Sequence, residues 1–241
     1  MARLPILMYH NVSDDETKSF NLTISTQRLE QQLQYIVSKK FTSFFVSELE
    51  NLKAIPTKSI VLTFDDVTEN QLLYAVPLLK KYNVKATFFI PFYYIGKTDL
   101  WNSGDDATDE KIMTITQLKS LDPEVIELGH HSYSHKKYAT MTAKEIQEDF
   151  DKSYEVIAEN DLKVYPSLAY PYGNFPKKEI QKEQFFELLK QNNIKMAFRI
   201  GNRVNAFPFK NNYEIQRIDV KGHKNLFQFK WKLRWGKMLL F

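Results

Sequence analysis

Two short segments of the chain carry side chains that could perform hydrolytic chemistry. The first, Thr63-Phe64-Asp65-Asp66, places two adjacent carboxylates directly after an apolar run. Because neighbouring side chains at the end of a strand diverge, one carboxylate can bind a cation while the other accepts a proton. The alternative interpretation is an Asp-Asp turn that follows a strand and has no chemical role.

The second segment is rich in histidine. Three of the five histidines in the chain lie within His130-His131-Ser132-Tyr133-Ser134-His135, again just after an apolar run. His131 and His135 are four residues apart, so one helical turn would place both imidazoles on one face. Two neutral imidazoles and one carboxylate make an open site for Zn²⁺ or a similar divalent ion, with water and substrate at the remaining positions. A solvated polar loop is the alternative.

A third segment, Ala169-Tyr170-Pro171-Tyr172-Gly173, follows another short apolar run. Its turn residues could present a backbone N–H group and an aromatic wall to a ligand. Taken alone, the pattern fits a plain loop better than a site.

Apolar runs alternate with stretches of helical periodicity along the chain. The runs predict buried strands at residues 5–9, 59–64, 85–90, 125–128 and 167–169. Apolar residues at helical spacing predict helices over 27–39, 72–82, 142–159 and 181–191. Thr142 and Glu145 have the spacing of a capping box at the start of the third helix. Strands that alternate with helices predict an α/β fold with a parallel sheet or barrel, in which sites form at the carboxyl ends of strands.

The composition limits the class of protein. The chain has 241 residues, enough for one substantial core, with 43% apolar and 26% charged residues, which argues against disorder. A formal charge of only +4 and the lack of a recognised motif argue against a nucleic-acid binder. There is no cysteine, so a metal site must use histidines and carboxylates. The N-terminal apolar stretch is too short for a signal peptide, which predicts a cytoplasmic location.

In this order, the three segments resemble the motifs of the polysaccharide deacetylase, or NodB-homology, family of carbohydrate esterases. Asp65-Asp66 is similar to the first motif, and Tyr170-Pro171-Tyr172-Gly173 is similar to the third. His131-Ser132-Tyr133-Ser134-His135 resembles the second, the metal-binding motif H-[ST]-x-x-H. The resemblance covers residues 4–223 and implies an irregular (β/α) barrel as a single catalytic domain over 1–225, followed by a tail over 226–241.

The resemblance also implies an activity and a role for each matched residue. The activity is metal-dependent removal of N-acetyl groups from an amino-sugar-containing glycan or glycolipid. Asp66, His131 and His135 would hold one divalent ion, with Zn²⁺ expected. Asp65 would act as the general base, and the backbone N–H of Tyr172 would help to stabilise the oxyanion. A catalytically weakened sugar-binding protein and a different C–N hydrolase of the same fold, such as a deformylase, are the alternatives.

The chain departs from the family pattern at three places. Val67 stands where the first motif often ends in glycine, and Ala169 stands where the third motif usually begins with the arginine that orients the base. The late Leu-x-His motif, which supplies a general acid, is not recognisable. Arg217 is a candidate for the lost arginine, and His10 and His223 are candidates for the acid. A structural or surface role is an equally good interpretation of each.

The C-terminal tail has its own pattern. Phe227, Phe229, Trp231, Leu233 and Trp235 alternate with polar and basic residues, which predicts a strand with an aromatic face and a basic face. The chain then ends in the apolar run Met238-Leu239-Leu240-Phe241. The tail could pack on the barrel or could form a peripheral contact with an anionic membrane surface. The second interpretation suits an enzyme that acts on a lipid-linked sugar.

Overall fold

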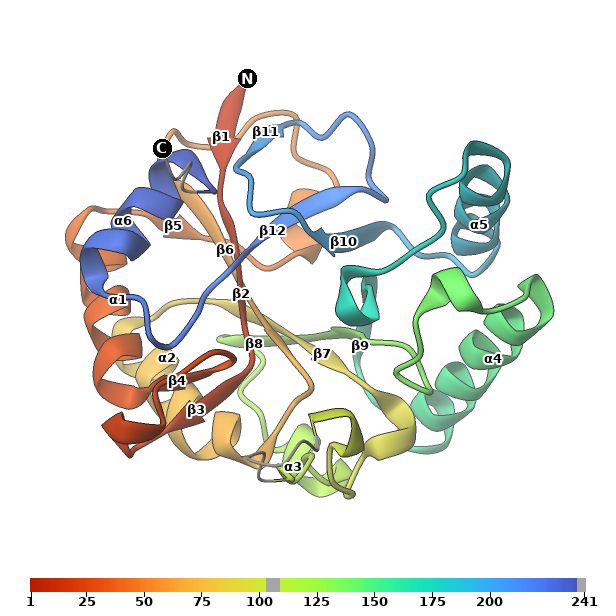
Figure 1. The fold of residues 1–241 in the computed structure, drawn as a ribbon, viewed down its shortest axis with the longest axis horizontal. Helices are drawn as coiled ribbons and strands as arrows, with labels where there is room; N and C mark the ends of the chain where they lie inside the picture. The colour runs from red at the N-terminus through yellow and green to blue at the C-terminus, as the bar shows by residue number, and fades with distance from the viewer. Residues whose placement is uncertain (103–108, 238–241) are drawn as a thin grey trace.

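Seven parallel strands close into a barrel in the computed structural model, which describes residues 1–102 and 109–237 (Figure 1). The order around the ring is β2 (Ile6–Tyr9), β6 (Ser59–Asp65), β7 (Ala86–Ile90), β8 (Ile126–His130), β9 (Val164–Ala169), β10 (Met196–Ile200) and β12 (Ile215–Asp219). The ring closes because β2 pairs in parallel with both β6 and β12. The five strands expected from the apolar runs are confirmed as β2, β6, β7, β8 and β9.

Short strands extend this framework. β5 (Thr42–Ser43) pairs with the start of β6, β1 (Ala2–Leu4) pairs with β11 (Asn205–Phe207), and β3 (Asn11–Ser13) pairs with β4 (Thr23–Ser25). Single helical turns lie between the strands, namely η1 (Glu16–Lys18), η2 (Ser47–Leu49), η4 (Phe92–Tyr94), η5 (Leu100–Asn102), η6 (Tyr138–Thr140) and η7 (Pro171–Gly173).

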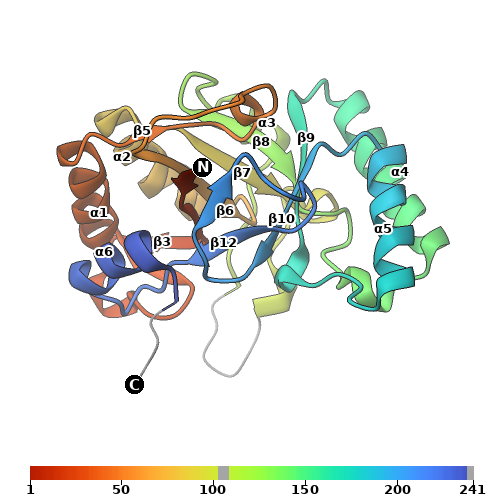
Figure 2. The same ribbon diagram turned by 90° about the horizontal axis from the view of Figure 1, so that it is seen from above.

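The helices cover the barrel on two sides. α1 (Thr26–Ser38), α2 (Val76–Tyr82) and α6 (Leu226–Trp235) lie on one side, whereas α4 (Ala143–Glu159) and α5 (Glu179–Gln191) lie on the other (Figures 1 and 2). α3 (Ile115–Lys119) is a short helix before β8. The four predicted helices are present, although the second begins with a π-helical turn, η3 (Gln71–Ala75), before α2. The capping box of Thr142 and Glu145 begins α4 as predicted.

Apolar side chains fill the barrel below its polar end. Phe89 on β7 and Phe198 on β10, which are not neighbouring strands, approach to 5.8 Å between ring centroids across the interior. Gly129 on β8 makes room for them, because a Cβ atom there would lie 2.7 Å from the Phe89 ring. The packed interior leaves the carboxyl ends of the strands as the place for polar side chains.

The strand predicted for the C-terminal tail is wrong, because residues 226–235 form the helix α6. Asn225 and Gln228 form a capping box that satisfies the first backbone N–H groups of the helix. Phe229 and Leu233, four residues apart, bury their side chains, and the Phe229 ring meets Tyr35 of α1 edge-on at 6.5 Å. A helical period therefore explains which aromatic residues are buried, and a period of two does not.

The apolar run Met238-Leu239-Leu240-Phe241 lies outside the described residues. Within the described ranges, the structure contains no helix with the length and apolar character needed to cross a bilayer.

Substitutions in α6 test this assignment. Phe229→Ala should lower the free energy of unfolding by about 3–5 kcal/mol, because it removes a buried aromatic ring. Phe227→Ala should change it by about 0.5 kcal/mol or less, since the Phe227 side chain is 68% exposed. Urea unfolding of both variants measures the difference. Equal losses would contradict the helix, because a strand would place both rings on one face.

Candidate active site

The first motif ends β6 in a sharp turn. Asp65 is the last residue of the strand, and Asp66 and Val67 follow with φ angles of 75° and 44°. Positive φ is unusual for a β-branched residue and costs about 1–3 kcal/mol, so Val67 keeps the conformation that favours glycine at this place in the motif. The turn is held from both sides, because Asp66 N–H donates to the Phe89 carbonyl and the Val67 carbonyl accepts from Met113 N–H.

The second motif lies in a loop after β8. The helical turn expected for His131 and His135 is wrong, because Ser132 and His135 have φ angles of 65° and 53°. The two imidazoles converge nevertheless, with 3.2 Å between their Nε2 atoms. The buried carboxylate of Asp149, on α4, fixes the loop between the two histidines. It accepts hydrogen bonds from the backbone N–H groups of Tyr133 and Ser134 at 2.7 and 2.9 Å.

Asp66, His131 and His135 form a buried group whose candidate ligand atoms all lie within 4.8 Å of one another. Asp66 Oδ1 is 3.5 Å from Nε2 of each histidine and has no hydrogen-bond partner within the part of the chain that the structure describes. His131 Nδ1 lies 2.8 Å from the Ala169 carbonyl, so Nδ1–H donates there and the Nε2 lone pair faces Asp66.

The electrostatics of this group favour a bound cation. Burial lowers the pKa of both His131 and His135, which keeps the imidazoles neutral and able to act as ligands. Burial and the neighbouring carboxylate of Asp65 raise the pKa of Asp66 well above its ordinary value. A divalent cation among these three side chains would compensate the buried carboxylate.

Arg217 on β12 holds Asp65 through two parallel hydrogen bonds. Nη1 donates to Oδ1 at 2.6 Å and Nη2 donates to Oδ2 at 2.7 Å. Burial alone would raise the pKa of Asp65, but the Arg217 guanidinium outweighs burial and holds the pKa below the ordinary value. The contact that the sequence predicts for Arg217 is therefore present, and the guanidinium comes from β12 instead of position 169.

His10 and His223 differ in their placement. His10 Nε2 lies 3.9 Å from Asp65 Oδ2, at the cleft wall. Burial lowers the pKa of His10 to about 4, although Asp65 opposes the shift, so His10 is neutral near pH 7. His223 is exposed, lies beside Phe20 with ring centroids 5.2 Å apart and ring planes tilted by 38°, and is not among the described residues that line the cleft.

The third motif contributes Tyr170, Tyr172 and Gly173 to the wall of the cleft. Tyr172 has a φ angle of 57°, and its ring centroid lies 5.0 Å from that of His135. Gly173 follows with a φ angle of 61° and packs so closely on Ile200 that a Cβ atom would lie 2.8 Å from the Ile200 backbone. This tight turn places both Tyr172 and Gly173 at the cleft.

Among the cleft residues absent from the sequence prediction, three are aromatic or charged. Trp101, on η5, stacks on His135 with ring centroids 3.8 Å apart and lines the cleft beside Asp66. Asp219 and Lys221 lie at the rim and form an ion pair of 3.0 Å. A single aromatic residue in a loop carries no periodic signal, whereas Asp219, two residues beyond Arg217, could have been found from its place at the end of β12.

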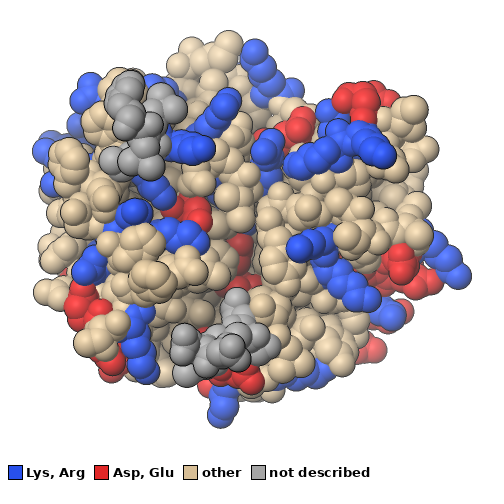
Figure 3. Space-filling view, viewed as in Figure 1, with Lys and Arg blue, Asp and Glu red and all other residues tan. Residues whose placement is uncertain are grey.

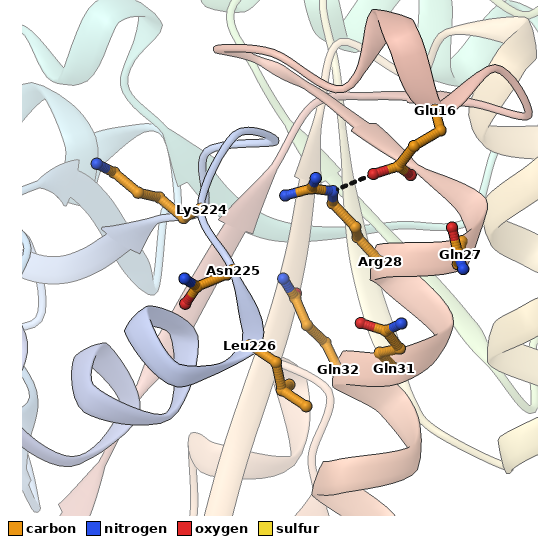
Figure 4. Close-up of a pocket in the computed structure, with 8 residues that line it drawn as sticks. All are labelled: Glu16, Gln27, Arg28, Gln31, Gln32, Lys224, Asn225 and Leu226. Carbon is orange, nitrogen blue, oxygen red and sulfur yellow. Dashed lines mark hydrogen bonds and ion pairs between the residues drawn. The ribbon is translucent and has the colours of Figure 1, made fainter.

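A second cavity lies between α1 and the start of α6 (Figure 4). It contains none of the three motifs, and its Arg28 is paired with Glu16 at 2.5 Å. The cleft at the carboxyl ends of the strands instead combines His10, Asp65, Asp66, His131, His135 and Tyr172, with Arg217 in contact with Asp65. This cleft is the candidate active site.

The ion pair gives a prediction about stability and pH. Arg217→Met should lower the free energy of unfolding by about 3–5 kcal/mol, because Asp65 stays buried without its partner. The folded-state pKa of Asp65 lies below the unfolded value, so the pair stabilises fully above that value and less as the pH falls through about 4. Urea unfolding at about pH 7 and pH 3 measures how far the free energy of unfolding of each variant falls between the two pH values. This fall should be smaller in Arg217→Met, which lacks the pair, than in Arg203→Met, an exposed control that keeps it. Equal losses would exclude the pair as the cause.

Known proteins share both the sequence pattern and the fold. The family model for polysaccharide deacetylase matches residues 53–188. Poly-beta-1,6-N-acetyl-D-glucosamine N-deacetylase of Staphylococcus aureus (strain MSSA476) is 28% identical over 217 residues, which cover 88% of this chain and 71% of that protein. The corresponding protein of Staphylococcus epidermidis (strain ATCC 35984) is 27% identical over 217 residues, covering 83% and 68%.

Two solved structures have the same barrel. The Streptococcus pyogenes deacetylase PplD in complex with acetate superposes with a TM-score of 0.76 at 20% identity, covering 96% of this chain and 98% of that one. IcaB from Ammonifex degensii also gives a TM-score of 0.76 at 20% identity, covering 98% and 97%. The family match, together with the barrel and the three motifs at its polar end, shows that this chain belongs to the polysaccharide deacetylase family.

Proposed function

We propose that the protein is a metal-dependent hydrolase that removes N-acetyl groups from an amino-sugar-containing glycan or glycolipid. The observation that carries the proposal is the convergence of Asp66, His131 and His135 beside a carboxylate, Asp65, that Arg217 keeps ionised. The related staphylococcal proteins are named as deacetylases of poly-beta-1,6-N-acetyl-D-glucosamine, which supports an N-acetylated glucosamine polymer or oligomer as the substrate class.

The donor set fits one divalent cation with open coordination positions. Two neutral imidazoles and a carboxylate with an unpartnered oxygen are ligands that suit Zn²⁺, which we propose as the ion. When bound, such an ion lowers the pKa of coordinated water and polarises the acetyl carbonyl. His131 is oriented for this role by its contact with the Ala169 carbonyl.

The remaining roles follow from the positions of the side chains. Asp65 is ionised and accepts the proton of the attacking water, while Arg217 fixes the direction of its carboxylate. The backbone N–H of Tyr172 donates to the oxyanion that develops on the acetyl carbonyl. The C–N bond then breaks, and the amine must receive a proton. His10, neutral and 3.9 Å from Asp65, can take the proton from Asp65 and pass it to the amine.

Asp65→Asn should reduce acetate release from N-acetylglucosamine oligosaccharides by about 10²-fold or more, since it removes the general base. The variant should keep its metal, because Asp65 is not among the three proposed ligands. Asp161→Asn, at an exposed position, is the matched control and should leave turnover unchanged. Turnover like that of the wild type in Asp65→Asn would exclude Asp65 from the mechanism.

His131→Ala, His135→Ala and Asp66→Ala should each lose stoichiometric metal, because each removes one of three protein ligands. Elemental analysis of the purified variants measures this loss, and His223→Ala at the exposed histidine should retain the metal of the wild type. Full occupancy in Asp66→Ala and His135→Ala would rule out the ligand assignment. Release of formate from an N-formyl substrate, without release of acetate from any N-acetylated sugar, would favour a deformylase instead.

A further inference from the structure

α6 has two apolar faces, and in the part of the chain that the structure describes only one of them is buried. Phe229 and Leu233 are buried on the side that packs against α1. Phe227, Trp231 and Trp235 follow at intervals of four residues along the other side, where they are 68%, 42% and 52% exposed. Residues four apart lie on one face of a helix, so these three rings form a continuous exposed stripe.

The surroundings of this aromatic stripe are basic. After Asp219 the chain contains no further acidic residue, but it contains six basic ones, namely Lys221, Lys224, Lys230, Lys232, Arg234 and Lys237. Arg3 and Arg203 join this set, because they line one surface depression together with Trp235 and Lys237. Figure 3 shows Lys and Arg side chains at the upper left, where α6 lies in Figure 1, as well as elsewhere on this face.

Three of the cations beside the stripe have no carboxylate partner among the described residues, although Lys221 is paired with Asp219. Within the described residues, no ion pair involves Lys230, Arg234 or Arg3. The Lys230 ammonium lies 4.8 Å from the centroid of the Tyr35 ring, and the Arg234 guanidinium lies 5.0 Å from that of Trp235. Their charges therefore remain available to a negatively charged partner.

We propose that α6 binds the surface of a membrane that contains anionic lipid. Tryptophan and phenylalanine favour the boundary between headgroups and acyl chains, and basic residues beside them are attracted to anionic headgroups. A second copy of the chain fits this face less well, because a symmetric pairing on α6 would bring the same basic residues of two copies together. The positive charge of this face therefore favours an anionic membrane surface over a second copy of the chain.

The position of α6 gives this contact a consequence for the cleft. Lys232 Nζ donates to the Asp219 carbonyl at 2.6 Å, and both Asp219 and Lys221 line the cleft. A membrane that held α6 would therefore hold the cleft wall close to its surface. If the proposed deacetylation is correct, a sugar attached to a lipid would be presented beside the proposed metal ligands. Membrane binding itself does not depend on that activity.

Flotation of the full chain with vesicles tests the proposal. Phosphatidylcholine vesicles with about 30% phosphatidylglycerol should bind the protein at low salt and release it at high salt, whereas phosphatidylcholine alone should bind little. Combining Lys230→Gln with Arg234→Gln should weaken binding about 25-fold, or about fivefold for each basic residue removed. Combining Trp231→Ser with Trp235→Ser should remove most of the remaining affinity.

Matched controls lie on the opposite side of the barrel. Lys144→Gln with Lys190→Gln removes two exposed cations from α4 and α5, and Ile180→Ser removes a side chain that is 73% exposed. Both controls should bind as the wild type does. Thermal unfolding confirms that each variant is folded, and acetate release from a soluble oligosaccharide, which should be unchanged in the α6 variants, tests the proposed activity separately.

Three results would overturn the proposal. Equal binding to neutral and anionic vesicles would exclude recognition of charge, and unchanged binding in both α6 variants would exclude α6. A dimer in gel filtration that the tryptophan variants abolish, in a protein that binds no vesicles, would identify a second copy as the occupant.

Discussion

The ion pair between Arg217 and Asp65 joins two strands that are not neighbours in the ring. Arg217 belongs to β12 and Asp65 to β6, and β2 lies between them. Both side chains are almost fully buried, so either charge alone would cost several kcal/mol. The guanidinium also lies 5.6 Å from the centroid of the Phe89 ring, which caps the apolar interior. The pair therefore requires the closed barrel, and it fixes Asp65 relative to the adjacent turn that carries Asp66.

Much of the fold follows from local patterns. Apolar runs and helical periodicity were enough to predict five barrel strands and four helices, because each of these segments buries one continuous face. The strands β10 and β12 were missed since Met196-Ala197-Phe198-Arg199-Ile200 and Ile215-Gln216-Arg217-Ile218-Asp219 interrupt their apolar residues with polar ones. On β12, Arg217 contacts Asp65 and Asp219 lines the cleft, so residues of the candidate site obscured the pattern of that strand. In the tail, alternating aromatic residues hid the helical period of α6.

The residues of the candidate site that lie within the three sequence motifs could be predicted, whereas those from distant segments mostly could not. Residues close in sequence, such as Asp65 and Asp66 or His131 and His135, were grouped correctly, although the loop conformation of the histidines was not foreseen. Contacts between distant segments depend on packing that no short pattern encodes. Arg217 was identified as a candidate only because Ala169 stands where the family pattern usually has the arginine that orients the base. Trp101 and the strained conformation of Val67 had no comparable signal.

The placement of the three tryptophans makes the intrinsic fluorescence of the chain an informative signal. Trp101 stacks on His135, so its emission should respond when that imidazole changes its charge or its ligand. Trp231 and Trp235 lie 6.4 Å apart, are about half exposed, and report on the solvent at α6. A soluble quencher should therefore reach the α6 pair more readily than the indole at the cleft. One spectrum thus contains two separable reporters, one for the interior of the cleft and one for the outer surface.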